Sequence, residues 1–275
     1  MPDVRPFRAL RYETEVIGDL AAVVSPPYDA IGPAEALDLL ARHPKNAVRL
    51  DLPVGEQGDG PDDRYRRAAR TFAAWRSDGT FHKDPRPSLY VYEQTDRGSE
   101  PGVERIRRGF FGRLPLQPFG PESNVLPREA PSAAHREDRY KLLRATGVNT
   151  SPIVCLYTDP SGQASRILAS VGATHSDIDL TDPGAVRHRV WTLAADGPAA
   201  EAVSGLIAAV GSAPVTIADG QARYESALRY RDERRMSRSC EEDPAFDYIL
   251  ALFVEGPEAA STQPLTGLVL NPHEW

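Results

Sequence analysis

Proline is the residue that most limits what this chain can fold into. The 275 residues include 25 prolines and 21 glycines, and proline is well above its usual share of about 5%. Because proline fixes φ and has no backbone N–H to donate, it interrupts helices and the central strands of sheets. The segment Ser25-Pro26-Pro27-Tyr28-Asp29 and the proline-rich residues 115–134 are therefore predicted to be irregular. The proline content predicts short elements joined by shaped loops and argues against a helical bundle.

The apolar patterns between these breaks follow two different periods. Spacings of three and four residues, typical of amphipathic helices, occur at residues 33–41, 65–75, 136–146, 199–210 and 221–234. Apolar and β-branched runs, typical of strands, occur at residues 21–24, 46–52, 88–94, 105–114, 152–157, 189–193, 214–218, 248–254 and 265–270. Helices and strands are mixed without strict alternation, so we predict the α+β class, with mixed sheets and flanking helices.

The length favours one or two domains, because a domain usually holds about 100–200 residues. We expect an N-terminal α+β region at residues 1–114 and a second region at residues 115–275, packed together as one compact unit. A chain of this size buries roughly 70–75% of its unfolded surface. It therefore needs no metal ion or disulfide to hold its core together.

Charge and composition exclude several classes of protein. The formal net charge of −7 makes nucleic acid an unsuitable partner, because binding to a phosphate backbone depends on positive charge. The two cysteines, Cys155 and Cys240, lie far apart without a CxxC pattern, which suits a reducing compartment. No window resembles a signal peptide or a membrane span. We therefore expect a cytoplasmic protein that does not bind membranes.

Residues 215–228 carry the strongest chemical signal. An apolar strand ends in Asp219-Gly220, and a helix with Arg223 in its first turn follows directly. The first turn of a helix presents N–H groups and the positive end of the macrodipole to an anion. Gly220 lets the backbone approach the anion, and Arg223 can make a forked contact with phosphate. The pattern predicts either a phosphate cradle or a plain strand–turn–helix with Asp219 as the N-cap.

Two other segments carry weaker signals. Glu129 lies in a proline-shaped loop, where burial would raise its pKa and make it a general base; the alternative is a solvated glutamate. Tyr28 and Asp29 follow two prolines, a rigid place from which to line a pocket or simply to form a turn. The six histidines show no i, i+3 or i, i+4 pairing, so no metal site built from imidazoles is expected.

Five blocks of residues follow one another along nearly the whole chain. They are Arg5-Pro6-Phe7-Arg8-Ala9-Leu10, Ser25-Pro26-Pro27-Tyr28-Asp29, Asp138-Arg139, Ser151-Pro152-Ile153 and Ile217-Ala218-Asp219-Gly220. In type and order these blocks resemble the bacterial and archaeal proteins known as domain of unknown function 1015. The resemblance implies that the chain is a member of that family.

The second half of that family is similar in turn to the ParB/sulfiredoxin-like fold, and especially to free-serine kinases that use ATP or ADP. The matching positions are Arg128-Glu129, Arg139, Pro152-Ile153 and Asp219-Gly220-Gln221-Ala222-Arg223. The resemblance implies that Glu129 deprotonates the substrate hydroxyl and that Asp219 assists catalysis by helping to hold Mg²⁺. It also implies that residues 220–223 and Arg139 hold the nucleotide phosphates. We add Tyr28, Asp29 and Arg128 as candidate residues of the substrate pocket.

The chain departs from the kinase pattern at four positions. The paired histidines after Asp-Gly are Gln221 and Ala222, the histidine before the glutamate is Arg128, and a nearby threonine is Pro131. Two imidazoles that would polarise a phosphate or orient the substrate are therefore absent. Two functions remain open. One is a nucleotide-dependent phosphotransferase acting on the hydroxyl of a small amino-acid-like substrate, with Mg²⁺ and ATP or ADP; the other is a catalytically degenerate protein that binds nucleotide or phosphate.

Overall fold

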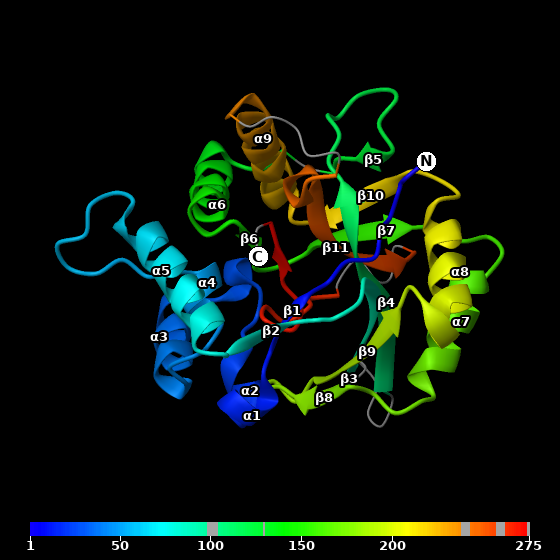
Figure 1. Ribbon diagram of the computed structural model, residues 1–275, viewed down its shortest axis with the longest axis horizontal. Coiled ribbons are helices and arrows are strands. Elements are labelled where there is room, and N and C mark those ends of the chain that lie inside the picture. The colour runs from blue at the N-terminus through cyan, green and yellow to red at the C-terminus, as the bar shows by residue number, and fades with distance from the viewer. Residues whose placement is uncertain (98–103, 129, 238–242, 257–261, 274–275) are drawn as a thin grey trace.

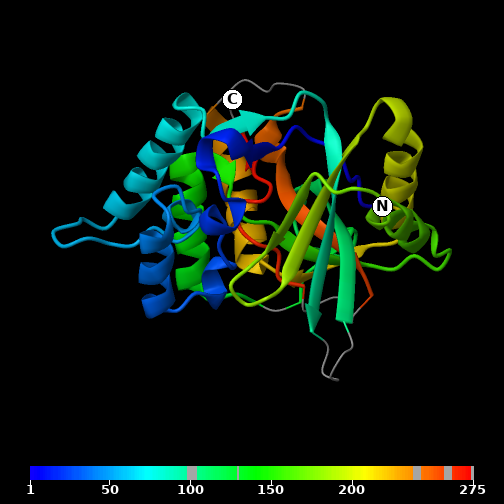
Figure 2. The same cartoon turned by 90° about the horizontal axis from the view of Figure 1, so that it is seen from below.

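A mixed sheet of eight strands runs through the middle of the computed structural model, which describes residues 1–97, 104–128, 130–237, 243–256 and 262–273. Its strand order is β5-β10-β7-β11-β4-β3-β9-β8. Two smaller sheets, β1-β2 and β12-β6, each have two strands. Figures 1 and 2 show the helices grouped around the large sheet, with α7 and α8 at one end and α3 and α5 at the other.

The described residues form nine α-helices, three 3-10 helices and twelve strands. The helices are α1 (Thr14–Ile17), α2 (Leu20–Val23), α3 (Pro33–Arg42), α4 (Val48–Asp51), α5 (Asp63–Ser77), α6 (Ala133–Thr146), α7 (Gln163–Gly172), α8 (Ala200–Val210) and α9 (Gln221–Ser237). The 3-10 helices are η1 (Tyr28–Ala30), η2 (Gly197–Ala199) and η3 (Ala245–Asp247). The strands are β1 (Leu10–Tyr12), β2 (Phe81–Lys83), β3 (Ser88–Arg97), β4 (Glu104–Pro115), β5 (Val125–Leu126), β6 (Val148–Asn149), β7 (Ile153–Tyr157), β8 (Ile178–Thr181), β9 (Arg187–Ala194), β10 (Val215–Asp219), β11 (Tyr248–Glu255) and β12 (Asn271–Pro272).

Strand β11 forms the centre of the large sheet. Its residues 248–254 are all buried, and only the last position, Glu255, is charged. Near-continuous apolar runs of this kind are typical of strands that are covered on both faces. β11 pairs with β7 in parallel and with β4 in antiparallel register. The sheet is therefore mixed at its centre, with a protein layer on each side.

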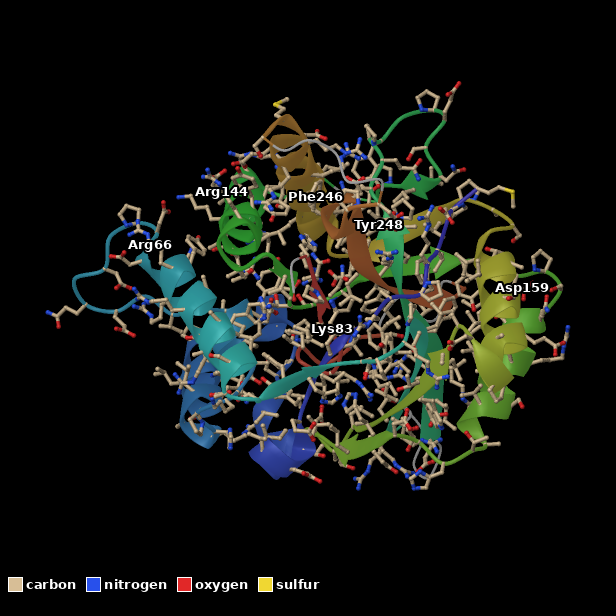
Figure 3. All side chains as sticks on the ribbon, viewed as in Figure 1. Arg66, Lys83, Arg144, Asp159, Phe246 and Tyr248 are labelled. Carbon is tan, nitrogen blue, oxygen red and sulfur yellow. The ribbon has the colours of Figure 1, made fainter. Side chains whose placement is uncertain are left out.

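Four helices cover one face of the sheet. Buried side chains from α6, α7, α8 and α9 form one large cluster, to which the strands contribute Phe110, Cys155 and Phe253 among others. Helix α6 packs along α9, and α7 packs along α8 (Figure 1). Figure 3 shows that side chains fill the space between the ribbons, with Phe246 and Tyr248 labelled near α9 and β11. This layer is the main hydrophobic core.

Segments from near both ends of the chain cover the opposite face. Residues 7–24 and 265–269 contribute buried apolar side chains to the cluster on this side. Backbone hydrogen bonds join Ser25 and Thr266 in both directions. A third cluster connects the β1-β2 pair to α5 through side chains that include Trp75. The segment with the two prolines is therefore hydrogen-bonded to a segment near the C-terminus.

The α+β class predicted from the sequence is confirmed, with a large mixed sheet and several flanking helices. The five predicted helices correspond to α3, α5, α6, α8 and α9, and their ends differ from the prediction by three residues or fewer. Six predicted strands correspond to β3, β4, β7, β9, β10 and β11. These elements have strong local patterns, which explains the agreement.

The strands predicted at residues 21–24, 46–52 and 265–270 are wrong. The first two segments form the short helices α2 and α4, and the third makes only isolated bridges. In the second segment the Asn46 side chain donates to the carbonyls of Ala22 and Val24, and it accepts from the N–H of Val48. A side-chain amide that bonds to nearby and distant backbone competes with a strand ladder. The alternating pattern of residues 46–52 therefore predicted a strand where the chain forms the helix α4.

Both regions distinguished in the sequence contribute to the large sheet. β3 and β4 come almost wholly from residues 1–114, and they pair with each other. The six remaining strands of that sheet come from residues 115–275, and one of them, β11, pairs with β4 along seven residue positions. Residue 114 lies inside β4. The sheet is therefore continuous across the expected boundary.

Candidate functional site

Two parallel strands bring two distant loops to the same edge of the sheet. β5 pairs with β10 in parallel, with Val125 opposite Val215 and Leu126 opposite Thr216. Parallel strands end at the same edge, and this edge is where ligands commonly bind. One loop leads into α6 and the other into α9, and the two helices pack against each other (Figure 1). The starts of α6 and α9 are therefore neighbours.

A cavity of about 420 Å³, the α9 cavity, opens at this edge. Its size falls within the usual range of small-molecule sites. It is lined by Tyr28 and Asp29, by Arg128, Ala130, Pro131 and His135, and by residues 217–222. Seven residues predicted for the site lie on it: Tyr28, Asp29, Arg128, Asp219, Gly220, Gln221 and Ala222. Glu129 lies outside the described residues.

Gly220 joins β10 to α9 with a backbone conformation that favours glycine. Its φ is +84°, which side chains with a Cβ rarely adopt. A Cβ at this position would lie 2.8 Å from Nε of Arg223 and 3.0 Å from Cγ2 of Ile153. The absence of a Cβ therefore lets the guanidinium group of Arg223 pack directly against the turn.

Arg223 is buried behind this turn, with 9% of its side chain exposed. Its Nη2 donates to Oδ2 of Asp219 at 2.7 Å, and its Nη1 donates to Oγ of Ser151 at 3.4 Å. The buried Nε has no hydrogen-bond partner among the described residues. Arg223 does not line the α9 cavity. The group predicted to clamp phosphate is thus paired with the carboxylate predicted to help hold Mg²⁺.

Tyr28 links the α9 cavity to two buried guanidinium groups. The Cζ of Arg139 lies 3.8 Å from the centre of its ring, and the Cζ of Arg223 lies 5.3 Å from it. Both distances suit a cation–π interaction. Burial raises the pKa of Tyr28, and the two arginines oppose this rise. Tyr28 therefore remains a neutral phenol that lines the cavity and covers both arginines.

Arg139, predicted to hold phosphate, is instead surrounded by carboxylates and does not line the cavity. Its Nε donates to Asp138 at 2.8 Å, and its Nη1 donates to Oδ1 of Asp51 at 3.4 Å. Asp51 also accepts hydrogen bonds from Thr150 at 2.6 Å and from Thr266 at 3.1 Å. Burial alone would raise the pKa of Asp138, but Arg139 and its other partners hold that pKa below its usual value. Arg139 therefore supports the site from behind Tyr28.

The side chain of Gln221 ties together the two loops of the α9 cavity. Its Oε1 accepts a hydrogen bond from the backbone N–H of Arg128 at 3.0 Å, and its Nε2 donates to Glu225 at 2.9 Å. The residue that replaces a histidine of the kinase pattern therefore connects the start of α9 to the loop after β5. The side chain of Arg128 is exposed and makes no hydrogen bond or ion pair with any described residue.

His135 is a cavity residue that the sequence analysis missed. It lies in the first turn of α6, where its N–H donates to Oγ of the N-cap Ser132 at 3.2 Å. Its exposed side chain lines the α9 cavity. A search for histidine pairs at helical spacing cannot find His135, because the other residues that line the cavity come from distant segments of the chain. Its place in a helix start beside a proline-rich loop is the only local signal.

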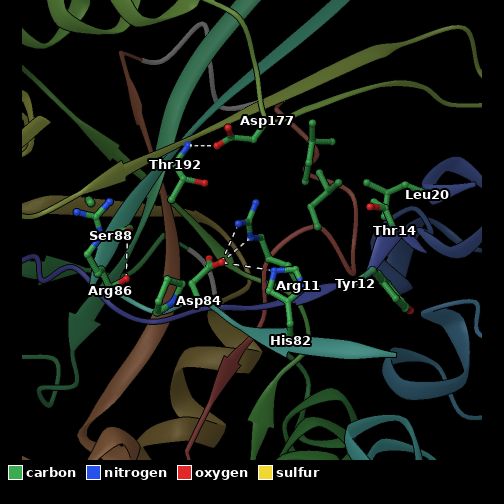
Figure 4. A pocket seen from close by; sticks show the side chains of 14 residues that line it. Arg11, Tyr12, Thr14, Leu20, His82, Asp84, Arg86, Ser88, Asp177 and Thr192 are labelled. Atoms are coloured by element: carbon green, nitrogen blue, oxygen red, sulfur yellow. Dashed lines mark hydrogen bonds and ion pairs between the residues drawn. The ribbon is translucent and has the colours of Figure 1, made fainter. Parts of the chain in front are cut away.

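A second cavity, the Asp84 cavity, has a volume of about 470 Å³ and lies where the β1-β2 pair meets β3 and β9 (Figure 4). Oδ1 of the buried Asp84 accepts from Nε of Arg11 at 3.1 Å and from its Nη2 at 2.7 Å, while Oδ2 accepts from Tyr90 at 2.7 Å. Burial alone would raise the pKa of Asp84, but His82, Arg11 and Tyr90 lower it to about 2. The charged groups at the centre of this cavity therefore neutralise one another.

Two features are absent from the part of the chain that the structure describes. No three side chains of histidine, cysteine, aspartate or glutamate are grouped in a way that could hold a metal ion by themselves. None of the helices within the described ranges is long and apolar enough to cross a membrane.

Comparison with known proteins places the chain in a family without a known activity. A family model described as a protein of unknown function, DUF1015, matches residues 4–259. No curated protein matches the chain, and no solved structure matches it. The matched residues include all three segments that line the α9 cavity. The chemistry of the site therefore has to be argued from its own residues.

Proposed function

The chain belongs to the DUF1015 family of proteins of unknown function, and we propose that it is a nucleotide-dependent phosphotransferase. The donor is ATP or ADP, and the acceptor is the hydroxyl of a small amino-acid-like substrate. One observation carries the proposal: residues predicted for the phosphate cradle and residues predicted for the substrate pocket line the same cavity. Phosphoryl transfer depends mainly on positioning and on neutralising charge, and both can be supplied by such a cavity.

Two helix starts support phosphate binding. α6 reaches the α9 cavity through His135, and α9 reaches it through Gln221 and Ala222. In any α-helix the N–H groups of the first turn have no partner within the helix, and the positive end of the macrodipole favours an anion. Both helices are long, with 14 and 17 residues. Phosphates between the two starts would face Gly220, where the backbone allows close approach.

The residues present fit a Mg²⁺ ion that is bound together with the nucleotide. Mg²⁺ is usually held by one or two carboxylates, by substrate phosphates and by water. Asp29 and Asp219 supply two carboxylates on the same cavity, and the side chain of Asp219 is 44% exposed. When bound, the ion supplies charge neutralisation for the phosphates. Asp29 and Asp219 would hold it at the α9 cavity.

Glu129 is the proposed base, because the resemblance to free-serine kinases assigns that role to its position. Both of its neighbours in the chain, Arg128 and Ala130, line the α9 cavity. A base for an alcohol has to reach the hydroxyl within about 2.6–3.2 Å in the productive complex. We also propose that residues 115–275 share the ParB/sulfiredoxin-like fold of those kinases. The strand, Asp-Gly turn and helix at β10 and α9 support this relation.

A second function, binding of nucleotide or phosphate without transfer, is favoured by one specific observation. Arg223 and Asp219 form an ion pair with each other. Arg223 neutralises the carboxylate of Asp219, which weakens its attraction for a metal ion, and Arg223 is too deeply buried to follow a phosphate. A protein that keeps the pair when nucleotide is bound would bind without transferring.

An assay with ATP or ADP, Mg²⁺ and a panel of hydroxy amino acids tests the proposal, with the phosphorylated amino acid as the measured product. Formation of that product supports the phosphotransferase. Nucleotide binding without product supports the second function. If the protein neither binds nucleotide nor forms product, both functions are wrong.

Glu129→Gln is the most specific variant for this assay. It is expected to abolish transfer and to leave nucleotide binding nearly unchanged, because the amide keeps the shape but cannot accept the proton. Glu122→Gln changes an exposed glutamate of the same proline-rich segment, so it is the matched control and should transfer normally. Normal transfer by Glu129→Gln would show that another group is the base.

A further inference from the structure

The positive charge available in the α9 cavity comes from one of its walls. Among the described residues that line it, Arg128 and His135 are the two whose side chains can carry positive charge. Neither side chain forms a hydrogen bond or an ion pair with any described residue. An anion can therefore bind to these two groups without first breaking an existing interaction.

Arg223 is unsuited to this contact, although the sequence pattern singles it out. It is held by Asp219 and Ser151, and 9% of its side chain is exposed. Its guanidinium group packs against Gly220, and Arg223 is not among the residues that line the cavity. To reach a ligand it would have to break its pair with Asp219 and displace Tyr28, whose ring lies against it.

We propose that Arg128 and His135 contact the terminal phosphate of the bound nucleotide, and that Arg223 positions the turn at Gly220. The inference rests on the proposed function, because it takes a nucleoside diphosphate or triphosphate as the ligand of the α9 cavity. Arginine offers a planar fork to two phosphate oxygens, and a protonated imidazole donates to a third. Both side chains belong to the wall that Arg128, Ala130, Pro131 and His135 form, so this wall binds the phosphate.

A histidine in this wall makes nucleotide binding depend on pH. Histidine changes charge between about pH 5 and 8, and a neighbouring phosphate favours the protonated form. The other titratable or charged groups on the cavity are Tyr28 and Asp29 from η1, Arg128 from the loop after β5, and Asp219 from β10. The contribution of His135 is complete when its imidazole is protonated before binding. It is lost as the pH rises through the pKa of the complex.

Calorimetric titration with ADP at about pH 6 and about pH 8 tests this inference. His135→Gln is expected to weaken binding about tenfold at the lower pH and less than about twofold at the higher pH, because only the protonated imidazole adds charge. Arg128→Ala is expected to weaken binding about tenfold or more at both, because arginine stays protonated. The matched controls are His175→Gln and Arg42→Ala, two exposed residues outside the cavity lining, and both should bind ADP normally.

The outcomes separate this inference from the proposed function. If ADP binds equally well to the unchanged protein, to His135→Gln and to Arg128→Ala, the inference is wrong and the proposed function stands. If inorganic pyrophosphate binds but ADP and ATP do not, and both substitutions weaken that binding, the two residues are phosphate contacts and the nucleotide-dependent function is wrong. If none of the three ligands binds, both are wrong.

Proton NMR gives a readout that does not depend on affinity. The imidazole C–H signal of His135, assigned by its loss in His135→Gln, should shift when ADP is added, because the phosphate then lies against the ring. The signal of His175 should not shift. An unmoved signal of His135 in a protein saturated with ADP would contradict the contact.

Discussion

The Asp84 cavity and the α9 cavity differ less in size than in the state of their charges. Their volumes are about 470 Å³ and about 420 Å³. In the first, Asp84 is paired with Arg11 and accepts a further hydrogen bond from Tyr90. In the second, the side chains of Arg128 and His135 have no partner among the described residues. The first cavity therefore has a paired carboxylate at its centre, whereas the wall of the second carries two side chains that can be positively charged and have no partner among the described residues.

The same contrast separates stability from binding. Removing one member of a buried ion pair leaves a charge without a partner, which is costly. Removing an exposed side chain that has no partner changes the free energy of unfolding very little. Substitutions in the Asp84 cavity should therefore lower stability and leave ligand binding intact, while substitutions in the wall of the α9 cavity should do the reverse.

Asp84→Asn should have the largest effect on stability. Arg11, whose side chain is 17% exposed, would lose the carboxylate that neutralises it, and breaking such a pair costs about 3–5 kcal/mol when it is buried. We expect the free energy of unfolding in urea to fall by about 3 kcal/mol, with ADP binding unchanged. Arg128→Ala should lower it by less than about 0.5 kcal/mol. Similar losses of stability in Asp84→Asn and Arg128→Ala would contradict the difference drawn between the two cavities.

Acid should remove the contribution of Asp84 in the unchanged protein. Its pKa is about 2 when folded and about 4 in an unfolded chain. A lowered pKa stabilises the fold above about pH 4, and this contribution of about 2 kcal/mol is lost as the pH falls through the folded pKa. The difference in unfolding free energy between the unchanged protein and Asp84→Asn should therefore shrink between about pH 4 and pH 2. A constant difference over that interval would contradict the lowered pKa.

Gly220→Ala should destabilise the turn before α9 by about 1–2 kcal/mol, because a residue with a Cβ is strained at positive φ. The added Cβ should also push on the guanidinium group of Arg223, which lies 2.8 Å from its position, and so weaken ADP binding. Gly18→Ala is the matched control, because Gly18 has a φ of +75° but nothing within 4 Å of a Cβ. Thermal denaturation and ADP titration of both variants measure the effect. Equal ADP affinity in both would show that the turn does not shape the site.

Tyr28→Leu should lower stability by no more than Gly220→Ala does. The loss of the ring from Arg139 and Arg223 removes cation–π contacts worth about 1 kcal/mol in total. Tyr28→Phe keeps the ring and should unfold nearly like the unchanged protein. Urea denaturation of the two variants separates the contribution of the ring to stability from that of the hydroxyl. Equal stability of Tyr28→Leu and Tyr28→Phe would show that the stacking on the arginines contributes little.

Local patterns were sufficient to predict α6, β10 and α9, but not β5 or η1, which also carry the candidate site. The strand and helix expected at residues 214–218 and 221–234 are β10 and α9. Apolar periodicity, a glycine at the turn and the prolines before α6 are all local signals, so they can be read without the fold. The pairing of Asp219 with Arg223 has the i, i+4 spacing of helical ion pairs and could also have been predicted.

The remaining features depend on segments that are far apart in the sequence. The partners of Asp51 lie 88 to 215 residues away, so no local pattern marks it as the carboxylate behind Arg139. The strand expected at residues 46–52 failed for the same reason, because Asn46 bonds to the backbone of Ala22 and Val24. His135 becomes a candidate only once the parallel pairing of β5 with β10 places α6 beside α9.

A crystal structure of the protein with ADP and Mg²⁺ is the most direct test of the central claim. We predict that the phosphates lie in the α9 cavity between the starts of α6 and α9, with Arg128 and His135 in hydrogen-bond contact with the terminal phosphate. We also predict that Arg223 stays against Gly220. Phosphates bound in the Asp84 cavity, or a nucleotide held elsewhere with the α9 cavity empty, would contradict the account.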